Sequence, residues 1–530
     1  MYSATLPISA GRLREFGSGE RHRFTFPLAI TALAFLSSYF QLFIFFNVAI
    51  APWGDGVLFL ENGRRILHGV LPYRDYLQFI TPGIDLFYAA VLRVWNVSAW
   101  IPNLAMAILA AAIVLLTTLI ATRFFQGLLV LIPGLLLTGF VFPSSLYATH
   151  HWFATAAVLG AILVLLDKSS IVRAIAAGFL CGIAVDFTQS SGALALLAFT
   201  VFLMIESSRK GIRRQVFRRC AVLWAGAGLA FLGVNGYFIW LAGVRQYLFC
   251  TVVFPLRYWG SASFGSWRIL GEQFSFHMGL TRLIGFGFVY AVVPVVYAAW
   301  FLHRRSRPQC DLDRGRRELL VASAGLALFL AVVSAPSFLR LCTAAPTAVI
   351  LLVAIVRERR PARLFLTAAA CAALLLTIGV PARTQQHLRG FLTTPSGRIA
   401  FLDSGRLSEF RWVLAHTTEG QAFFGHAPAS FAFRLTNPTP VNFMTKTDYT
   451  RPSEVAAIVR GLEDTRAPML LLPADDDPRP PSRQAIVFRD YVTAHYQLAM
   501  RFASGDEAWL REDAGPTPPS ADQSAIVRDR

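Results

Sequence analysis

"FPLAITALAFLSSYFQLFIFFNVAIA", Phe26–Ala51, runs its whole length without a charged residue. A helix of about 20 apolar residues is enough to cross the hydrocarbon core of a bilayer, which is about 30 Å thick. The run is also longer than the roughly 7 to 15 apolar residues of a cleaved signal peptide. We therefore expect an uncleaved membrane helix over residues 26–50, preceded by a short basic segment, residues 1–25.

Apolar runs of this kind recur along the chain. Of its residues 55% are hydrophobic and 15% are charged, whereas soluble domains carry about 25% charged residues. The sequence therefore predicts a polytopic α-helical membrane protein with about 11 transmembrane helices in residues 26–381. A shorter apolar stretch, 81–94, is expected to lie along the membrane surface. The expected crossings are 26–50, 99–120, 127–146, 152–166, 171–187, 191–206, 221–242, 281–302, 318–334, 338–356 and 363–381.

The net charge of +18 is concentrated in the short connectors between apolar runs. This distribution follows the positive-inside rule, so it indicates membrane topology rather than nucleic-acid binding. We expect a multi-pass protein of the cell inner (plasma) membrane, with residues 1–25 and the basic connectors in the cytoplasm. The cations that define this side are Arg123, Lys168, Arg173, Arg209, Lys210, Arg213, Arg214, Arg218, Arg219, Arg304, Arg305, Arg307, Arg314, Arg316, Arg317, Arg357, Arg359, Arg360 and Arg363.

The chain changes character after Pro381, where it becomes polar and charged. An odd number of crossings places this part on the extracytoplasmic (periplasmic) face. Helical patterns at 405–416 and 453–462 alternate with short apolar runs, "QAFFG" and "MLLLP", that are typical of strands. We expect a small α/β domain over residues 382–512 and a disordered tail, residues 513–530.

A polar stretch, "GDGVLFLENGRRILHGVLPYRDY" (Gly54–Tyr76), follows the first crossing directly. It lies in the first external loop, residues 52–98, and carries Asp55, Arg74 and Asp75. Aspartate is a favoured N-cap, so Asp55 can be explained as the cap of the helix that follows it. Asp75 can likewise be explained as a turn residue or as the ion-pair partner of Arg74.

The other external connectors also carry polar side chains. Ionisable groups near a membrane are costly, which makes each of them a candidate functional group. Each also has a structural explanation: interfacial packing for the histidines, a solvated helix end for the aspartate, and lipid-headgroup contact for the arginines. Because all of them collect at one face, we expect a common site. They are His150, His151, Asp186, Gln189, Arg257 and Arg340.

These residue types suit transfer chemistry on a lipid phosphate. A carboxylate in a partly dry pocket has a raised pKa and is a competent base toward a hydroxyl. Arginine side chains hold phosphate groups through paired hydrogen bonds and stabilise the charge of a leaving phosphate. The sequence does not decide whether a divalent cation, Mg²⁺ or Mn²⁺, is a cofactor. The candidate carboxylate and histidine ligands lie on connectors that are far apart in the sequence, and their spacing matches no metal-binding motif.

The longer stretch "GDGVLFLENGRRILHGVLPYRDYLQFITPGIDLFYAAVLRVWN" resembles the first external loop of polyprenyl-phosphate-sugar-dependent glycosyltransferases of the GT-C fold. Those enzymes include protein O-mannosyltransferases and lipid A aminoarabinose transferases. "HHWF" at 150–153 and "SGALALLA" after Gln189 are similar to bacterial members of the group. The resemblance covers residues 26–381 and implies a many-helix bundle with a soluble external C-terminal domain.

The resemblance also implies an activity, which is the inverting transfer of a hexose or pentose from a polyprenyl-phosphate donor to an envelope glycan, lipid or protein. Asp55 would activate the acceptor hydroxyl, or bind a cation where one is used, and Asp75 would be the second acid of the loop. Bacterial relatives often carry a Lys-Gln pair where this chain has Thr188-Gln189. The donor phosphate would then be held by an arginine. The residues expected to bind donor or substrate are Arg74, His150, His151, Asp186, Gln189, Arg257 and Arg340.

Two other functions stay open on the sequence alone. A basic many-helix protein also suits a lipid or glycan transporter or flippase, but transporters usually place ionisable groups near the bilayer midplane. Here most of the expected crossings are free of internal charge, and the polar residues lie outside them. The third option is a non-catalytic component of envelope assembly, because the C-terminal part contains no recognisable catalytic motif.

Overall fold

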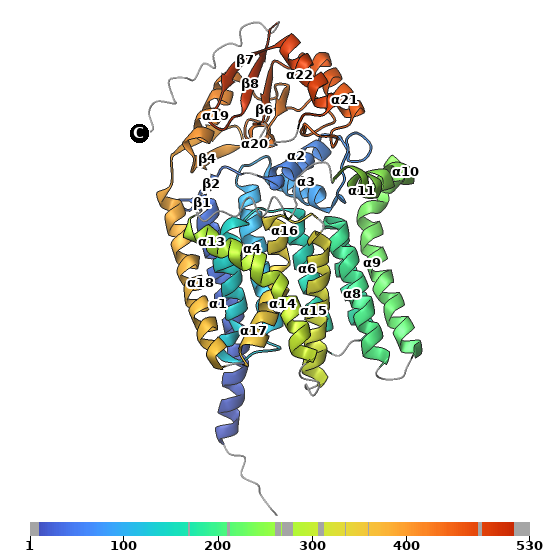
Figure 1. Ribbon diagram of the computed structural model, residues 1–530, viewed down its shortest axis with the longest axis vertical. Helices are drawn as coiled ribbons and strands as arrows, with labels where there is room; N and C mark the ends of the chain where they lie inside the picture. The colour runs from blue at the N-terminus through green and yellow to red at the C-terminus, as the bar shows by residue number, and fades with distance from the viewer. Residues whose placement is uncertain are drawn as a thin grey trace, which may run out of the picture.

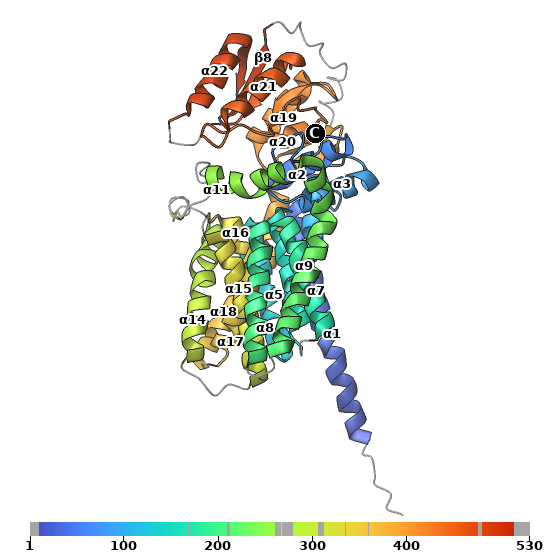
Figure 2. The same ribbon diagram turned by 90° about the vertical axis from the view of Figure 1, so that its right-hand side faces the viewer.

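The computed structural model describes residues 10–512, except 53, 168–169, 209–212, 260–266, 268–278, 306–311, 334, 359 and 475–479. A bundle of long helices forms the lower part of the molecule in Figures 1 and 2, and a second body of helices and strands covers its upper end. The predicted tail, residues 513–530, lies outside the described residues, as do the connector cations Lys168, Arg209, Lys210, Arg307 and Arg359.

Six described helices are long and apolar enough to cross a membrane. This composition is that of a helical, membrane-embedded protein. The interior of the bundle is filled by large apolar side chains such as Trp152 and Phe199, neither of which is exposed. The main helices of the bundle, long and shorter together, are α1 (Ala10–Leu42), α4 (Ile101–Ala121), α6 (His150–Leu165), α7 (Ile171–Phe187), α8 (Gln189–Ser208), α9 (Arg213–Ala242), α14 (Val293–Arg305), α15 (Leu312–Val333), α17 (Ala345–Val356) and α18 (Arg360–Gln386).

Several predicted crossings are broken into shorter helical pieces. Prolines mark some of these breaks, since Pro133, Pro143 and Pro346 each stand in the first turn of a piece. Proline lacks an amide hydrogen, so it costs no helical hydrogen bond in a first turn, whereas it removes one in a helix interior. The pieces are η1 (Gly127–Val130), α5 (Ile132–Leu136), η2 (Leu137–Val141), η3 (Phe142–Ser144), α13 (Leu280–Gly287), η6 (Phe288–Val292) and α16 (Phe338–Thr343).

The first crossing ends earlier than the sequence predicts. Helix α1 stops at Leu42, and the next residues form strands β1 (Phe43–Ile44) and β2 (Val48–Ile50). Strand β2 pairs in parallel with β4 (Gly397–Phe401), far along the chain. The prediction of a helix over 26–50 is therefore wrong at its C-terminal end, because this apolar segment finds a strand partner that no local pattern reveals.

The basic connectors meet at the lower end of the bundle. Arg316, at the start of α15, forms an ion pair of 2.7 Å with Glu206 at the end of α8. Arg123, after α4, lies 2.9 Å from Asp167, after α6, and its carbonyl accepts a hydrogen bond from Arg317. Connectors that are distant in sequence thus lie together, as the positive-inside pattern predicts, on the side opposite the C-terminal region in Figure 1.

Between the bundle and the C-terminal region lie two short helices of the first loop and a short helical segment after α9 (Figure 1). Helix α2 is Asp55–Leu67, and α3, Gly83–Trp95, corresponds to the predicted surface helix. The segment after α9 consists of α10 (Val244–Leu248), η4 (Phe249–Val253) and α11 (Phe254–Tyr258).

The C-terminal region contains two small sheets. The first has the order β1-β2-β4-β3 and joins the end of α1 to the start of this region. The second has the order β5-β6-β8-β7, with β5 parallel to β6 and the other pairs antiparallel. The predicted strands at "QAFFG" and "MLLLP" are its β5 and β6. The strands are β3 (Gly390–Thr394), β5 (Phe423–Gly425), β6 (Met469–Leu472), β7 (Tyr496–Arg501) and β8 (Glu507–Arg511).

Side chains alternate across the second sheet, as successive residues of a strand must. Phe423 and Met469 belong to one apolar cluster, which includes residues of α19, and Phe424 and Leu470 belong to another, which includes residues of α21 and α22. Helices therefore cover both faces, and the predicted helical segments at 405–416 and 453–462 are two of them. The helices are α19 (Ser404–His416), α20 (Ala427–Ala432), α21 (Pro452–Asp464) and α22 (Arg483–His495).

Candidate functional site

A cavity of about 1920 Å³ lies between the upper end of the bundle and the C-terminal region. It is larger than the roughly 300–1,000 Å³ of a typical small-molecule pocket. Its walls come from α2, from the loop 77–80, from the starts of α6 and α8, and from loops and strand ends of the C-terminal region. Of the residues predicted from the sequence to form a site, those that line the cavity are Asp55, His150, His151, Gln189 and Arg340.

Asp55 is the first residue of α2 and faces this cavity. The N-cap is Gly54, whose φ of 79° is the left-handed conformation that favours glycine, and no side chain caps the helix. The explanation of Asp55 as an N-cap is therefore wrong. Its side chain is accessible, but to the cavity rather than to an open surface, because protein surrounds it on nearly all sides. This loss of bulk water raises the pKa of the Asp55 carboxyl, and the charge of Arg340 opposes the shift.

Arg340 brings a positive charge to the wall near Asp55. Its backbone amide donates to the hydroxyl of the N-cap residue Ser337, and its Nη1 donates to the carbonyl of Ala335 at 2.7 Å. The guanidinium carbon lies 4.9 Å from the centre of the Trp259 ring. These contacts fix the side chain but leave several N–H groups available, because a guanidinium carries five donors.

His150 and His151 begin helix α6, and their ring centres are 3.9 Å apart. His150 Nδ1 is 2.9 Å from the Thr188 hydroxyl. Within the described part of the chain, His151 Nδ1 is buried without a hydrogen-bond partner. Both residues line the cavity.

Gln189 holds the wall together rather than presenting its amide nitrogen to the cavity. Nε2 donates to the carbonyl of Phe79 at 2.7 Å and to the carbonyl of Thr251 at 3.2 Å. These bonds connect the start of α8 to the first external loop and to η4. The position therefore couples three segments that are distant in sequence.

Aromatic side chains form one side of the cavity. The ring centres of Phe79 and Trp259 are 4.8 Å apart, and those of Trp259 and Tyr449 are 6.2 Å apart. Phe443 stacks on Tyr449 with an interplanar angle of 13°. Because Phe443 and Tyr449 come from the C-terminal region, this wall is complete only when that region covers the bundle. Such a surface suits a sugar ring or the first isoprene units of a lipid.

A set of hydrogen-bonded amide side chains also lines the cavity, next to α2. Buried Asp85 accepts hydrogen bonds from Gln78 Nε2 at 2.7 Å and from Asn62 Nδ2 at 3.2 Å. Asn62 Oδ1 in turn accepts from Asn442 Nδ2 of the C-terminal region at 2.8 Å. Asn62, Gln78 and Asn442 all line the cavity. Asp85 therefore orients the amides that connect the first external loop to the C-terminal region.

Asp85 predicts a pH dependence of stability. Burial raises its pKa from 3.8 to about 7, although the two amide hydrogen bonds oppose the shift. Between those values the folded protein keeps a proton that the unfolded chain has released, so stability falls as the pH rises toward 7 and changes little above it. We expect a loss on the order of 2–3 kcal/mol between pH 5 and 8. Thermal melting in detergent across this range measures it.

The matched variants for this measurement are Asp85→Asn and Asp464→Asn. The first removes the titrating group, so its melting temperature should depend on pH less steeply than that of the unmodified protein. Asp464 is an exposed carboxylate at the end of α21. The melting temperature of its variant should depend on pH as steeply as that of the unmodified protein. Equal slopes in all three proteins would contradict the assignment to Asp85.

Four predicted site residues do not line the cavity. Asp75 and Arg74 form an ion pair through two hydrogen bonds of 2.7 and 2.6 Å, away from Asp55. The bond from Arg74 holds the pKa of Asp75 below its usual value, against a small opposing effect of burial. Asp186 is buried behind the wall and accepts from Asn235 at 2.6 Å. Arg257 is exposed on α11, where its guanidinium lies 5.5 Å from the Tyr258 ring centre.

Among the described residues, no set of three or more metal donors is assembled around Asp55. In the described ranges, the one set of three or more histidine, cysteine or carboxylate groups with ligand atoms close together is Glu409, His426 and Asp506. Asp75 and Asp186, which the sequence also offers as ligands, do not line the cavity that Asp55 lines. A Mg²⁺ or Mn²⁺ ion at Asp55 therefore stays a prediction.

Several residues that line the cavity were not predicted from the sequence. Asn62 could have been found, because it lies seven positions after Asp55 and thus nearly two turns along the same helix face. Trp259 stands in an aromatic stretch that also fits an ordinary interfacial belt. Tyr449 and Asn442 carry no signal at all, since their role depends on how the C-terminal region docks.

The arrangement brings the Asp55 carboxylate, the Arg340 guanidinium and the imidazoles of His150 and His151 to one large, partly aromatic chamber. A carboxylate in such a setting can accept a proton from a hydroxyl, and the arginine can hold an anionic phosphate nearby. The chamber has room for two ligands at once. This combination suits a transfer between an anionic donor and a hydroxyl acceptor.

Comparisons with known proteins identify no family for this chain. No protein-family model matches the sequence, and no curated protein matches it.

Proposed function

We propose that the protein is a membrane glycosyltransferase that uses a polyprenyl-phosphate-linked sugar. The observation that supports this most strongly is the placement of Asp55 and Arg340 in one cavity of about 1920 Å³ at the end of a membrane bundle. A lipid phosphate reaches such a site from the bilayer, and a hydrophilic acceptor reaches it from the C-terminal side. The acceptor is an envelope glycan, lipid or protein.

In the proposed reaction, Asp55 takes the proton from an acceptor hydroxyl. That oxygen attacks the anomeric carbon of the donor, the bond from this carbon to the phosphate oxygen breaks, and the polyprenyl phosphate leaves with the bonding electrons. Attack from the side opposite the leaving group inverts the anomeric configuration. Arg340 stabilises the charge that develops on the phosphate. Asp75 has no part in these steps, because it is paired with Arg74 outside the cavity.

We also infer the membrane arrangement that this function needs. The bundle crosses the inner membrane about 11 times, since its shorter apolar helices can cross together with the six long ones. The N-terminus and the basic connectors face the cytoplasm. The cavity and residues 382–512, as an α/β domain, then face the periplasm. Contacts of Tyr449 with the first external loop and α11, and of Asn442 with α2, support a role of this domain as the roof of the site.

The test is an assay of the purified full-length protein in lipid with a panel of labelled polyprenyl-phosphate sugars. We expect release of polyprenyl phosphate from at least one donor when envelope lipids are supplied as acceptors. Arg340→Gln should raise the donor concentration needed for half-maximal release about tenfold or more, because a charge-assisted phosphate contact is lost. Arg257→Gln is the matched control, since Arg257 is an exposed arginine outside the cavity.

Transport would give a different result in the same liposomes. A flippase moves labelled lipid between leaflets without release of polyprenyl phosphate, and its rate should not depend on Asp55. Movement of the donor without cleavage, unchanged in an Asp55 variant, would therefore overturn the proposed transfer.

A further inference from the structure

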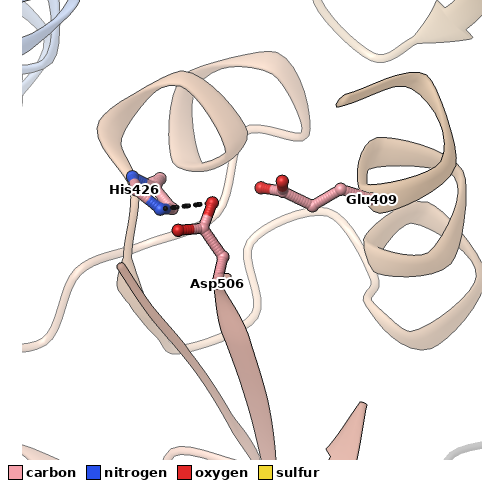
Figure 3. A group of neighbouring side chains, drawn as sticks. All are labelled: Glu409, His426 and Asp506. Carbon is pink, nitrogen blue, oxygen red and sulfur yellow. Dashed lines mark ion pairs between the residues drawn. The ribbon is translucent and has the colours of Figure 1, made fainter. Parts of the chain in front are cut away.

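Glu409, His426 and Asp506 come together at one end of the second sheet (Figure 3). Glu409 is on α19, His426 directly follows β5, and Asp506 directly precedes β8. Ala474, just after β6, donates its amide to Asp506 at 2.7 Å, so the carboxyl ends of both parallel strands meet here. In open α/β sheets, this end of the parallel strands is where ligands bind.

The donor atoms of the three side chains are close and buried. They lie within 4.8 Å of one another, and the side chains of Glu409 and Asp506 are 0% and 3% exposed. His426 Nε2 lies 3.2 Å from Asp506 Oδ2. Figure 3 shows the carboxylate of Glu409 directed at these two groups.

Among the described residues, one buried oxygen of this cluster lacks a hydrogen-bond partner. Arg406 Nη1 contacts Glu409 Oε2 at 2.9 Å and Asp506 Oδ2 at 2.5 Å, and the Ser504 hydroxyl donates to Glu409 Oε2 at 3.3 Å. Within the described ranges, Glu409 Oε1 is buried and has no hydrogen bond. Burying a carboxylate oxygen without a partner is costly. Arg406 therefore contacts both carboxylates but, among the described residues, leaves Glu409 Oε1 without a hydrogen bond.

We propose that Glu409, His426 and Asp506 bind a divalent transition-metal ion, with Zn²⁺ as the best fit. One imidazole and two carboxylates are ligands that Zn²⁺ takes at about 2.0–2.2 Å. Neighbouring ligands around a tetrahedral ion at that distance are about 3.3–3.5 Å apart, close to the observed spacing of His426 and Asp506. Glu409 Oε1 reaches the ion by a small rotation of its side chain. Arg406 contacts Oε2 of Glu409 and the same Oδ2 of Asp506 that His426 faces, so it is an outer partner of the ligands.

The site is distinct from the Asp55 chamber but adjoins it. His426, Ala474 and Gly505 are among the residues that line the cavity, whereas Glu409 and Asp506 lie behind them. A three-ligand Zn²⁺ site keeps a fourth position for water or for an oxygen of a ligand. The ion would fix α19, the end of β5 and the start of β8 together at the roof of the cavity. This proposal does not rest on glycosyl transfer.

The test is metal binding by the full-length protein, purified in detergent and stripped with EDTA. We expect Zn²⁺ titration by calorimetry to give one site per chain, and Co²⁺ to give the visible absorption of a tetrahedral site. His426→Gln and Glu409→Gln should each weaken binding by roughly 100-fold or more, because each removes a ligand. His416→Gln, on α19, and Glu419→Gln, at an exposed glutamate, are the matched controls and should bind as the unmodified protein does.

His426→Gln is the preferred variant, because the His426 side chain is 15% exposed and the substitution does not leave a fully buried polar group unpaired. A protein that takes up neither Zn²⁺ nor Co²⁺ at micromolar concentration would overturn the proposal, and the cluster would then be an ion network completed by Arg406. Binding that persists in folded His426→Gln and Glu409→Gln would also overturn it. Asp55→Asn should bind Zn²⁺ normally, which separates this result from the outcome of the transferase assay.

Discussion

Asp55→Asn is expected to lower the rate of sugar transfer by roughly 10²–10⁴-fold while the protein still folds, since that is the usual contribution of a positioned general base. The asparagine keeps the shape of the side chain but cannot accept the proton of an acceptor hydroxyl. Because Asp55 makes no cap bond to α2, the helix loses no hydrogen bond. The measurement is release of polyprenyl phosphate at saturating donor, with the melting temperature as the check on folding.

Asp75→Asn is the matched control for this experiment. It is the second acid of the same loop, but its carboxylate is paired with Arg74 outside the cavity, and exposed ion pairs contribute little to stability. We expect activity near that of the unmodified protein. Full activity in Asp55→Asn, or equal losses in both variants, would refute the role of Asp55 as the base.

The second large effect concerns the contact between α7 and α9. A Cβ atom on Gly178 would stand 1.9 Å from the carbonyl oxygen of Leu223, and one on Gly226 would stand 2.4 Å from that of Ile175. Small residues let membrane helices approach this closely, and packing rather than the hydrophobic effect holds them together. Gly178→Leu must therefore separate the helices, so we expect a fall of several kcal/mol in stability or a complete loss of folded protein.

Gly228→Leu is the control, because Gly228 is on α9 and a Cβ there would meet no atom within 4 Å. Leucine is the better helix former by somewhat less than about 1 kcal/mol, so this variant should be as stable as the original or slightly more so. Size-exclusion chromatography of fluorescently tagged protein in detergent, followed by thermal melting, measures both. A folded Gly178→Leu protein with an unchanged melting temperature would show that the two helices do not pack this closely.

The positions of the charged and polar residues at the two ends of the bundle could be predicted in part from the sequence. Charge on alternate connectors correctly groups residues as distant as Arg123 and Arg317 at one end of the bundle. It also selects Asp55, His150 and Arg340 for the other end, and these do share a cavity. The same reasoning includes Asp75 and Asp186 but cannot tell a carboxylate that faces a cavity from one that is paired nearby.

What the sequence determined by itself was the membrane-embedded helical class, the side of the bundle on which polar groups collect, and the local helices and strands of the C-terminal region. These properties follow from hydropathy, charge and periodicity, which are sums over neighbouring residues. Only the tertiary structure decided that α1 gives way to a strand, that Asn62 meets Asn442, and that Glu409 meets His426 and Asp506. Each of these depends on a partner far along the chain, and whether a side chain meets a cavity, an ion pair or a buried wall depends on that partner.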